Sequence, residues 1–343
     1  MKTLKFGILS TASINKYGFL PFIDTVPCVE LKAIASRSIS TARKYAEKNN
    51  IPVAYGSYDE LLSDPEIDCV YISLPVSMHK EWSIRAMKAG KHVLCEKPVA
   101  ANAKQAEEMA ECAGETGLVF AEAFHYRYHP LSKKIESIVR SGELGEVTKI
   151  YAQFGLALAD KNKVQFKPEL AGGALLDIGC YPVSFARWIA GCDKVTVDET
   201  RVRATSSGVD GTLRAKLIFE NGVTARIGGS LIEFMPMSAF IQCSRGSIFV
   251  VLPFKPSFQA GPLTIDAYLL ITQNGLRIRN IRVPKKITYQ CQFEAFCNAV
   301  RNGEPMITGP EEAVANMRII DEIYSKTNIP RLDFDWNAAN SDR

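Results

Sequence analysis

The residues with the clearest chemical potential form the stretch Cys95-Glu96-Lys97-Pro98, in which a charged pair stands directly before a proline. This stretch follows the apolar run His92-Val93-Leu94, which is typical of a buried strand. Lysine is costly to half-bury unless its charge has a function, so the stretch indicates a lysine held at the rim of a pocket. Pro98 stiffens the turn and is a candidate for a cis peptide bond. An ordinary solvated turn could have the same residues, so other parts of the sequence must distinguish between these two interpretations.

A carboxylate and a phenol stand four residues apart in the run Gly172-Gly173-Ala174-Leu175-Leu176-Asp177-Ile178-Gly179-Cys180-Tyr181-Pro182, which leads into a helical pattern over residues 183–190. If the helix begins near Leu175, Asp177 and Tyr181 lie on one face and point the same way. A capping aspartate and a packed tyrosine would give the same pattern, so both interpretations stay open here.

The first expected strand ends where a dinucleotide-binding fold would place its glycine-rich loop. The residues there are Ser10-Thr11-Ala12-Ser13-Ile14-Asn15, and none of the three usual glycines is present. Serine and alanine are small enough for backbone N–H groups to approach a pyrophosphate, so we expect residues Ser10, Thr11, Ala12, Ser13 and Ile14 to contact a cofactor. A plain strand-to-helix turn capped by a serine is the alternative.

The second expected strand ends in Ser36-Arg37-Ser38, with Arg43 and Lys44 close behind. A cofactor with a free ribose 2′-hydroxyl usually meets an acidic residue at this point. Arginine instead suits a phosphate, because its planar fork of donors matches phosphate oxygens. These residues therefore predict NADP in preference to NAD, against the alternative of a solvated loop arginine.

Two later stretches contribute further candidates. Leu74-Pro75 ends another strand with an extended backbone that could lie along the cofactor, and His79 would begin the next helix beside it. The run Ala121-Glu122-Ala123-Phe124-His125-Tyr126-Arg127-Tyr128-His129-Pro130 is rich in polar aromatics for a domain hinge. Arg127 and His129 within it predict a substrate-binding lip, although packing alone would explain its aromatic residues.

Composition excludes several classes of function. The 343 residues are 47% hydrophobic and 23% charged, with a net charge of +4, and no dense block of basic residues indicates nucleic acid or a membrane surface. Nine cysteines without a CxxC pair, together with four histidines, predict no metal site and a reduced, cytoplasmic setting. The start of the chain runs directly into an expected strand, and no apolar stretch approaches the ~18 residues of a spanning helix.

The elements that must position these residues fall into two groups. From residue 4 to about 120, short apolar runs alternate with helical patterns, which predicts a doubly wound parallel α/β sheet with ligands at the carboxyl ends of its strands. After Pro130, one helix is followed by alternating runs separated by turns such as Asn221-Gly222, which predicts a mostly antiparallel sheet. Two helical patterns over 289–301 and 310–326 end the series. The length also favours two domains, with a boundary near residues 122–130.

Together these stretches resemble the Gfo/Idh/MocA oxidoreductase family, in particular the branch with dimeric dihydrodiol dehydrogenases, NADP-dependent xylose dehydrogenases and glucose-fructose oxidoreductase. The resemblance extends over essentially the whole chain. The elements that carry it are Gly7-Ile8-Leu9-Ser10-Thr11-Ala12, Ser36-Arg37, Glu96-Lys97-Pro98, Glu122-Ala123-Phe124 with Tyr126-Arg127, and Gly172-Gly173 followed by Leu176-Asp177-Ile178-Gly179-Cys180-Tyr181. Ser10 replaces the family's usual glycine, and Tyr181 stands where many members have histidine, which places the chain in the tyrosine branch.

The resemblance implies an NADP-binding Rossmann domain over residues 1–123 and an α+β domain over 124–343. The large open sheet of the second domain would pair subunits into a homodimer or homotetramer. The resemblance also implies that Lys97, Asp177 and Tyr181 are catalytic. Glu96 and Lys97 would then also contact the cofactor, and Asp177 would contact a carbohydrate-like substrate.

The expected reaction is hydride transfer between the nicotinamide and a secondary alcohol or ketone carbon of a sugar, polyol or cyclic diol. Tyr181 would pass the proton, and Lys97 would supply the positive charge that a phenol of pKa about 10 needs near neutrality. The alternatives are a nucleotide-sugar ketoreductase, redox-assisted glycoside cleavage with a tightly held cofactor, and a non-catalytic NADP-binding regulatory protein. The presence of both Lys97 and Tyr181 favours an enzyme.

Overall fold

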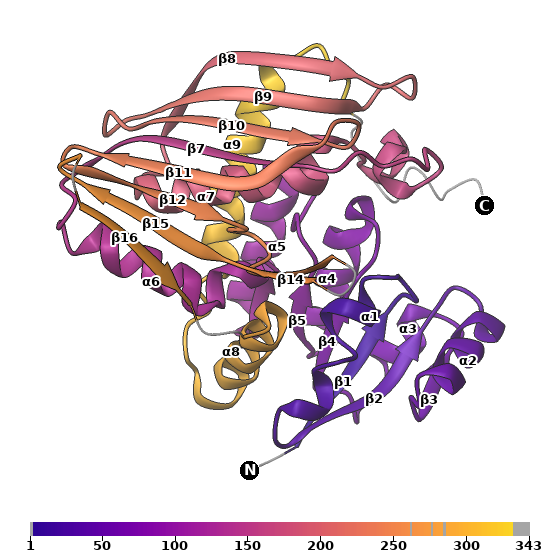
Figure 1. Ribbon diagram of the computed structural model, residues 1–343. Coiled ribbons are helices and arrows are strands. Elements are labelled where there is room, and N and C mark those ends of the chain that lie inside the picture. Colours follow the sequence, from indigo (N-terminus) through magenta and orange to yellow (C-terminus); the bar gives the residue numbers. More distant parts are fainter. Residues whose placement is uncertain (1–2, 261–262, 276, 284–285, 332–343) are drawn as a thin grey trace. The chain divides into compact units, whose positions relative to one another are not determined.

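The computed structural model describes residues 3–260, 263–275, 277–283 and 286–331. The chain divides into two compact units (Figure 1). The first unit contains the residues up to Phe124 and the later segment Tyr289–Val314, and the second contains His125–Thr288 and the segment that begins at Ala315. Across the described ranges, no helix combines the length and the apolar character needed to cross a membrane.

The first unit is built on a six-stranded parallel sheet, as the alternating pattern predicted. Its strands are β1 (Leu4–Leu9), β2 (Val29–Ala35), β3 (Val53–Tyr55), β4 (Cys69–Ile72), β5 (His92–Cys95) and β6 (Phe120–Glu122). The spatial order is β3-β2-β1-β4-β5-β6, which is the order of a doubly wound dinucleotide-binding sheet. Because the strands are parallel, the segments that follow β1, β2, β4 and β5 leave the same edge of the sheet.

Helices connect these strands. They are α1 (Asn15–Gly18), α2 (Ile39–Lys48), α3 (Tyr58–Leu62), α4 (His79–Lys88) and α5 (Ala103–Thr116), and the later helix α8 (Thr288–Asn302) also belongs here. The pattern over residues 14–24 predicted a longer helix than the single turn of α1. Gly18 and Pro21 explain the difference, because glycine favours a helix end and proline disrupts a helix that it enters.

The core of the first unit draws on residues far apart in the sequence. The Phe6 ring lies 5.0 Å from the Phe293 ring and 6.0 Å from the Phe296 ring, measured between centroids. Phe19 packs edge-on to Phe293 at 5.2 Å. The predicted division of the chain into residues 1–123 and 124–343 therefore differs from the observed one, because the apolar side of α8 completes the core beside β1.

The second unit contains an eight-stranded sheet in the order β16-β15-β12-β11-β7-β10-β9-β8. Only the β7–β10 pair is parallel, so the sheet is mostly antiparallel, as predicted. The strands are β7 (Val147–Gly155), β8 (Val195–Ala204), β9 (Asp210–Phe219), β10 (Thr224–Ser230), β11 (Met235–Cys243), β12 (Gly246–Val251), β15 (Tyr268–Gln273) and β16 (Arg277–Arg282). A separate hairpin pairs β13 (Ser257–Ala260) with β14 (Leu263–Asp266).

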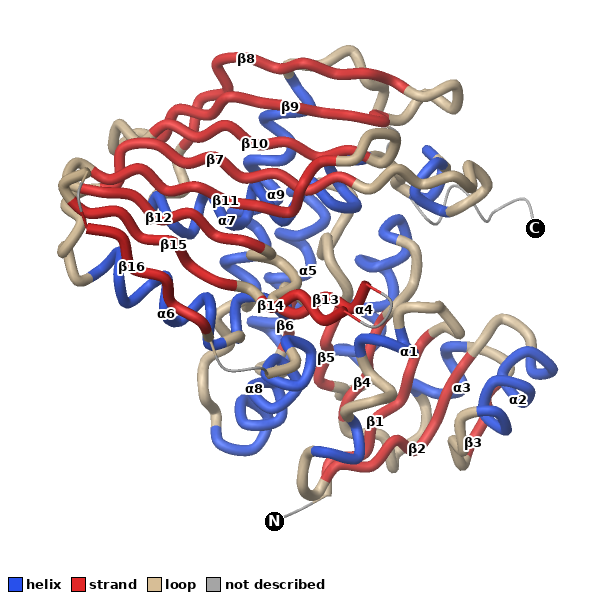
Figure 2. The backbone as a smooth tube through the Cα atoms, viewed as in Figure 1, coloured by secondary structure: helices blue, strands red, loops and turns tan. Residues whose placement is uncertain are grey.

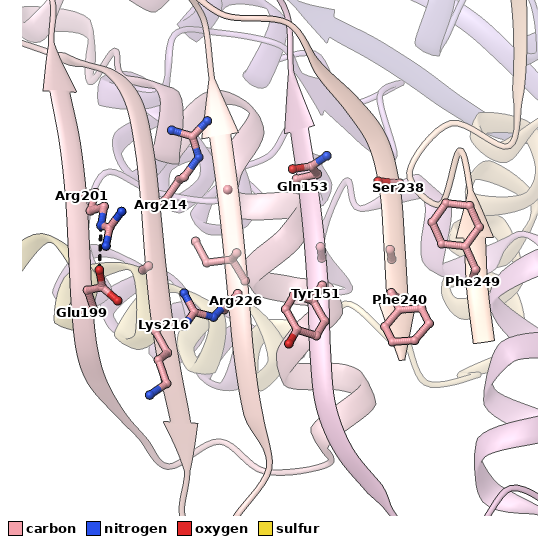
Figure 3. Close-up of a pocket in the computed structure, with 15 residues that line it drawn as sticks. Tyr151, Gln153, Glu199, Arg201, Arg214, Lys216, Arg226, Ser238, Phe240 and Phe249 are labelled. Atoms are coloured by element: carbon pink, nitrogen blue, oxygen red, sulfur yellow. Dashed lines mark hydrogen bonds and ion pairs between the residues drawn. The ribbon is translucent and has the colours of Figure 1, made fainter. Parts of the chain in front are cut away.

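Helices of the second unit lie along one side of this sheet (Figure 2). They include α7 (Cys180–Ala190), which packs on β7 and β10, and the later helix α9 (Pro310–Ser325); α6 (Pro130–Arg140) begins the unit. A π-helix over Leu175–Gly179 runs directly into α7. The opposite side of the sheet carries partly exposed aromatic and charged side chains (Figure 3).

Candidate active site

The loop after β1 is open and has one strained residue. Ser10 has φ +102°, a conformation that residues with a Cβ rarely adopt. Its Oγ accepts a hydrogen bond from the Ala12 N–H at 3.0 Å, and its carbonyl accepts one from the Asn15 Nδ2 at 2.8 Å. Thr11 to Ile14 are at least partly exposed. At Ser10 the loop therefore has a backbone conformation that glycine usually adopts. The other residues predicted to contact the cofactor, Thr11 to Ile14, are accessible to a ligand.

The end of β2 places polar groups beside this loop, because β2 is the neighbour of β1 in the sheet. Arg37 and Ser38 are exposed, and Ser36 is half-buried. The charge of Arg37 reaches Tyr58, whose pKa is raised by burial and lowered in part by the guanidinium. An exposed guanidinium and several hydroxyls next to an open loop of small residues fit the phosphates and ribose of a dinucleotide.

The residues that follow β5, numbers 96–99, are called the lysine loop from here on. Glu96 is 8% exposed and accepts a hydrogen bond of 2.5 Å from the Tyr71 hydroxyl. Tyr71 in turn stacks on Phe19 with ring centroids 4.7 Å apart. The second carboxylate oxygen of Glu96 accepts the Lys97 N–H at 3.2 Å. The loop thus begins with an anchored, buried carboxylate, which is not the arrangement of an ordinary solvated turn.

The other end of the lysine loop is also held by a buried acid. Glu122, 1% exposed at the end of β6, accepts the Val99 N–H through Oε1 at 2.8 Å. The Glu122 carbonyl accepts the Thr308 hydroxyl at 2.7 Å, which ties the end of β6 to the returning C-terminal segment. Glu96 directly follows β5, and Glu122 ends the neighbouring strand β6.

His79 bridges the ends of two strands. Its Nδ1 lies 2.9 Å from the Pro98 carbonyl oxygen, its Nε2 lies 2.8 Å from the Leu74 carbonyl oxygen, and the residue is 1% exposed. Burial lowers the pKa of His79. The predicted cofactor residue His79 is therefore placed as a support of the Leu74-Pro75 and Lys97-Pro98 segments, and its ring nitrogens face the chain itself. The Lys97-Pro98 bond is cis.

Lys97 is partly exposed at the centre of this framework. Its charge contributes to lowering the pKa of His79 and opposes the rise that burial produces in the pKa of Tyr289. A cation on a loop whose backbone is anchored by two buried acids, at the carboxyl edge of a parallel sheet, is positioned to act on a bound ligand. Among the residues that the structure describes, no group of three or more His, Cys, Asp or Glu is arranged to hold a metal ion.

In the second unit, residues 173–181 are called the tyrosine turn. The helix begins at Leu175, as predicted, but its first five residues form a π-helix before α7 continues. Asp177 is partly exposed within the π-helix, and its N–H donates to the Gly173 carbonyl at 3.0 Å. Tyr181 lies in the first turn of α7. π-Helical turns often occur at functional sites, because they shift the side chains that follow them.

Tyr181 is 6% exposed and lies in an aromatic cluster. Its ring centroid is 5.5 Å from that of Phe254, 6.2 Å from Phe154 and 6.0 Å from both His125 and Tyr126. The Tyr181 hydroxyl lies 3.4 Å from His125 Nε2. A phenol beside an imidazole nitrogen can pass a proton to it or receive one from it.

The predicted substrate residues Arg127 and His129 occupy more interior positions than a lip requires. The guanidinium of Arg127 lies 4.5 Å from the Trp188 ring centroid, and the residue is 8% exposed. His129 accepts the Leu131 N–H through Nδ1 at 3.1 Å, so its Nε2–H donates to the Lys286 carbonyl at 3.0 Å. His129 thus caps the start of α6, and both of its ring nitrogens bond backbone groups of the second unit.

Sequence reasoning did not single out His125 or Glu122. Both lie in the polar aromatic run in which Arg127 and His129 predict a substrate-binding lip, but the roles of His125 and Glu122 depend on neighbours that only the fold supplies. His125 meets Tyr181, 56 residues later, and Glu122 meets Val99. The excess of polar residues in that run was the available signal, because buried polar side chains must find partners.

The fold and the lysine loop define a class of protein, a Rossmann-fold oxidoreductase with a second, open-sheet α+β unit. Residues 4–124 match the model of the oxidoreductase family with an NAD-binding Rossmann fold, and residues 132–249 match that of the GFO/IDH/MocA C-terminal domain. The chain belongs to the Gfo/Idh/MocA oxidoreductase family, and it is an NAD(P)-dependent dehydrogenase or reductase.

Characterised relatives cover most of the chain. It is 36% identical to D-xylose 1-dehydrogenase (NADP(+)) 2 of Haloferax volcanii, over 94% of this chain and 96% of the relative. It is 33% identical to trans-1,2-dihydrobenzene-1,2-diol dehydrogenase of Xenopus laevis, over 76% and 78%. Among solved structures, it resembles a 3-ketoreductase from Actinomadura kijaniata in complex with NADP and TDP-benzene, with a TM-score of 0.85, 27% identity, and coverage of 94% and 98%.

Proposed function

We propose that this enzyme transfers a hydride between NADP and a secondary alcohol or ketone carbon of a sugar, polyol or cyclic diol, with Tyr181 as the proton carrier. The observation that carries the proposal is the Tyr181 hydroxyl beside His125 Nε2 at 3.4 Å, at the start of a helix whose preceding turn carries Asp177. A hydroxyl poised next to a second proton-accepting group suits the exchange of one proton per turnover.

Tyr181 needs help to act near neutral pH, because a free phenol has a pKa of about 10. In the proposal, Lys97 supplies the positive charge that favours the phenolate and bonds the substrate hydroxyl. The anchoring of both ends of the lysine loop supports this role, since a charge acts strongly only when its position is fixed. Asp177 orients a neighbouring hydroxyl of the substrate.

The cofactor assigned to the first unit is NADP. When bound, its nicotinamide donates or accepts the hydride, and the protein supplies binding and orientation. Ser10 to Ile14 hold the phosphates, and the exposed Arg37 binds the 2′-phosphate that distinguishes NADP from NAD. Similarity to an NADP-dependent xylose dehydrogenase supports this assignment.

A nucleotide-linked sugar is the second candidate substrate. The similarity to a 3-ketoreductase solved with TDP-benzene favours it, because a dTDP-type ligand adds a nucleotide and a diphosphate to the sugar. This substrate would need further cationic or aromatic contacts in the second unit. The reaction at the carbonyl carbon would remain the same, with the proton supplied by Tyr181.

We also assign the open side of the eight-stranded sheet to self-association, as a homodimer or homotetramer. It carries a depression of about 370 Å³ lined by aromatic and charged side chains (Figure 3). Tyr151 and Phe249 there are 42% and 36% exposed, whereas the charges are largely paired, as in the Glu199–Arg201 contact of 2.7 Å. Exposed aromatics among neutralised charges suit a subunit contact. Tyr151→Asp should lower the mass measured by light scattering, and an unchanged mass would contradict the assignment.

The function is tested by following NADPH absorbance in both directions. The panel contains aldoses including D-xylose, inositols, a trans-dihydrobenzenediol and a dTDP-linked keto sugar, with NAD and NADH run in parallel. Turnover with a sugar or diol supports the first proposal, and turnover confined to the nucleotide sugar supports the second. If NADPH binds but no panel member reacts, the catalytic proposal fails and a regulatory role takes its place.

A further inference from the structure

Asp210 is a buried acid that the proposed mechanism does not use. It stands at the start of β9 and is 0% exposed. Its Oδ2 accepts the Leu175 N–H at 2.7 Å, and its Oδ1 accepts the Tyr324 hydroxyl at 2.9 Å. Leu175 is the first residue of the π-helix that carries Asp177, so this carboxylate satisfies a backbone donor at the beginning of that helix. All of these residues belong to the second unit.

The glycine before this helix allows the carboxylate to approach. Gly173 has φ +128°, and a Cβ at this position would lie 2.2 Å from Asp210 Oδ1 and 3.1 Å from the Tyr324 hydroxyl. Any side chain there would push Asp210 or Tyr324 away. The close contact with Asp210 therefore explains Gly173, whereas a Cβ on Gly172 would lie 2.6 Å from the Gln165 carbonyl oxygen.

The far end of the π-helix is held by a second close contact. A Cβ on Gly229 of β10 would lie 2.9 Å from the Gly179 Cα and 3.1 Å from the Gly179 nitrogen. The π-helix is thus fixed against β9 through Asp210 and against β10 through Gly179. Asp177 lies between these two fixed points, and Tyr181 follows two residues after the second.

Tyr324 is itself held in place on the side of α9. The Arg331 guanidinium lies 4.6 Å from the Tyr324 ring centroid, and Arg331 Nη1 is 2.6 Å from an Asp321 carboxylate oxygen. Burial raises the pKa of Asp210 to about 6, whereas the bonds from Leu175 and Tyr324 and the nearby charge of Arg331 oppose that rise. The fold therefore keeps a costly buried acid at this point, where an apolar residue would leave the Leu175 N–H and the Tyr324 hydroxyl without this partner.

We propose that Asp210, held by Tyr324, is a positioning residue that sets Asp177 and Tyr181 for the reaction. This inference rests on the function proposed above for Tyr181. Small displacements of reacting groups have large effects on rate, so loss of the anchor is expected to lower kcat more than it changes binding. Binding of NADPH alone is assigned to the first unit and should not change.

The experiment compares four variants of the full-length enzyme. Asp210→Ala removes both hydrogen bonds, Tyr324→Phe removes one, and Asp210→Asn can accept from Leu175 and donate to the Tyr324 oxygen. Asp193→Ala is the matched control, because it removes the 2.6 Å contact with Arg187 near the other end of α7. The measurements are kcat and KM for the best substrate of the panel, the Kd of NADPH by fluorescence, and amide hydrogen exchange over residues 173–181.

We expect Asp210→Ala to lower kcat by about 10- to 100-fold with an unchanged Kd for NADPH, and to speed exchange in the tyrosine turn. The kcat and the exchange rates of Tyr324→Phe should lie between those of Asp210→Ala and the wild type. Asp210→Asn should retain most of the wild-type kcat. Equal losses of kcat in Asp210→Ala and Asp193→Ala, or unchanged exchange over residues 173–181, would overturn the inference.

The exchange measurement separates this inference from the proposed function. If the wild type turns over no substrate of the panel, the function fails, and the exchange rates still decide whether Asp210 fixes the tyrosine turn. If Asp210→Ala does not fold, Tyr324→Phe and Asp210→Asn carry the test. In that case faster exchange and lower kcat in Tyr324→Phe support the anchor, and wild-type values overturn it.

Discussion

The hydroxyl of Tyr181 lies 3.4 Å from Nε2 of His125, although 56 residues separate them in the sequence. Their rings are tilted by 61° with centroids 6.0 Å apart, so the imidazole presents its edge to the phenol. This geometry makes His125 a partner for a proton that Tyr181 gains or loses. It also makes the phenol hydroxyl the group whose removal tests the mechanism most directly.

Tyr181→Phe should abolish most of the activity while leaving the fold intact. The ring keeps its contacts with Phe154 and Phe254, and only the hydroxyl is lost. Loss of a proton-transfer group typically lowers kcat by about 10²- to 10⁴-fold. The check is kcat with the best substrate, together with the Kd of NADPH, which should stay at the wild-type value.

Tyr126→Phe is the matched control for this variant. It removes a buried phenol hydroxyl from the same aromatic cluster, where the group bonds Ser184 Oγ at 2.9 Å. We expect it to affect stability more than kcat, because burial and Ser184 define its environment. If Tyr181→Phe and Tyr126→Phe reduce kcat equally, the Tyr181 hydroxyl has no special role.

Lys97→Met should lower kcat by a similar factor, and the double variant should reveal whether the two residues act together. If Lys97 works by favouring the Tyr181 phenolate, the variant lacking both groups should be about as slow as the slower single variant. Multiplicative losses would show independent roles and would contradict this part of the mechanism. Circular dichroism of the four proteins checks that each is folded.

Arg37→Ala should weaken NADPH much more than NADH. The exposed guanidinium follows β2, where a 2′-phosphate would be bound, and NADH has no such group. A charge-assisted contact with phosphate typically contributes about 1.5–3 kcal/mol, so we expect a rise of about 10- to 100-fold in the Kd of NADPH. Lys48→Ala, which removes an exposed cation at the C-terminal end of α2, should change neither Kd. Equal losses for both cofactors would refute the assignment of Arg37.

Much of the first unit was predictable from local pattern. The apolar runs Leu4–Leu9 and His92–Cys95 predict strands, and β1 and β5 have these bounds, because fully buried parallel strands appear as apolar runs between polar residues. β12, with the residues Gly246-Ser247-Ile248-Phe249-Val250-Val251, was not predicted, because its sequence lacks the alternation of apolar and polar residues that is typical of a half-buried strand. In the sheet, Ile248 and Val250 are buried and Phe249 points to the open side, an alternation that the sequence does not reveal.

The site was predictable to the extent that its chemistry lies in consecutive residues. Glu96 and Lys97 stand out because charges rarely follow a buried strand directly. The partners that hold this loop are not local: Tyr71 bonds Glu96 and Glu122 bonds the Val99 N–H, and both come from other strands of the sheet. His129 has a structural role that the sequence pattern also allows, because a polar residue before a proline and a helix often serves as a cap.

Ser10→Gly should stabilise the first unit. A serine at φ +102° is strained by roughly 1–3 kcal/mol, and glycine removes that strain at the loss of one turn hydrogen bond. We expect a net gain of about 1 kcal/mol, read from the urea midpoint at constant slope. Thr11→Gly is the control, because Thr11 does not share this conformation and glycine there only adds freedom to the unfolded chain. A lower midpoint for Ser10→Gly than for the wild type would contradict the strain argument.

The stability of the second unit should fall as pH rises through about 6, and Asp210 should be the cause. Burial raises the pKa of Asp210 from 3.8 to about 6, so the folded state favours the protonated acid. That contribution is fully present below the unfolded pKa and is lost as pH rises through the folded pKa. Two pKa units correspond to about 3 kcal/mol, of which about half is lost between pH 5 and 8.

Asp210→Asn isolates this contribution, because the amide keeps the hydrogen-bonding positions and does not titrate. Thermal unfolding of the wild type and the variant is measured between pH 5 and 8. As pH rises, the variant should become more stable relative to the wild type. The nearby groups Tyr324 and Arg331 remain in both proteins, and burial holds the pKa of the Tyr324 hydroxyl well above its ordinary value. If the stability of both proteins depends on pH in the same way, the pKa of Asp210 is near its ordinary value. Burial of the charged carboxylate would then destabilise the fold only slightly.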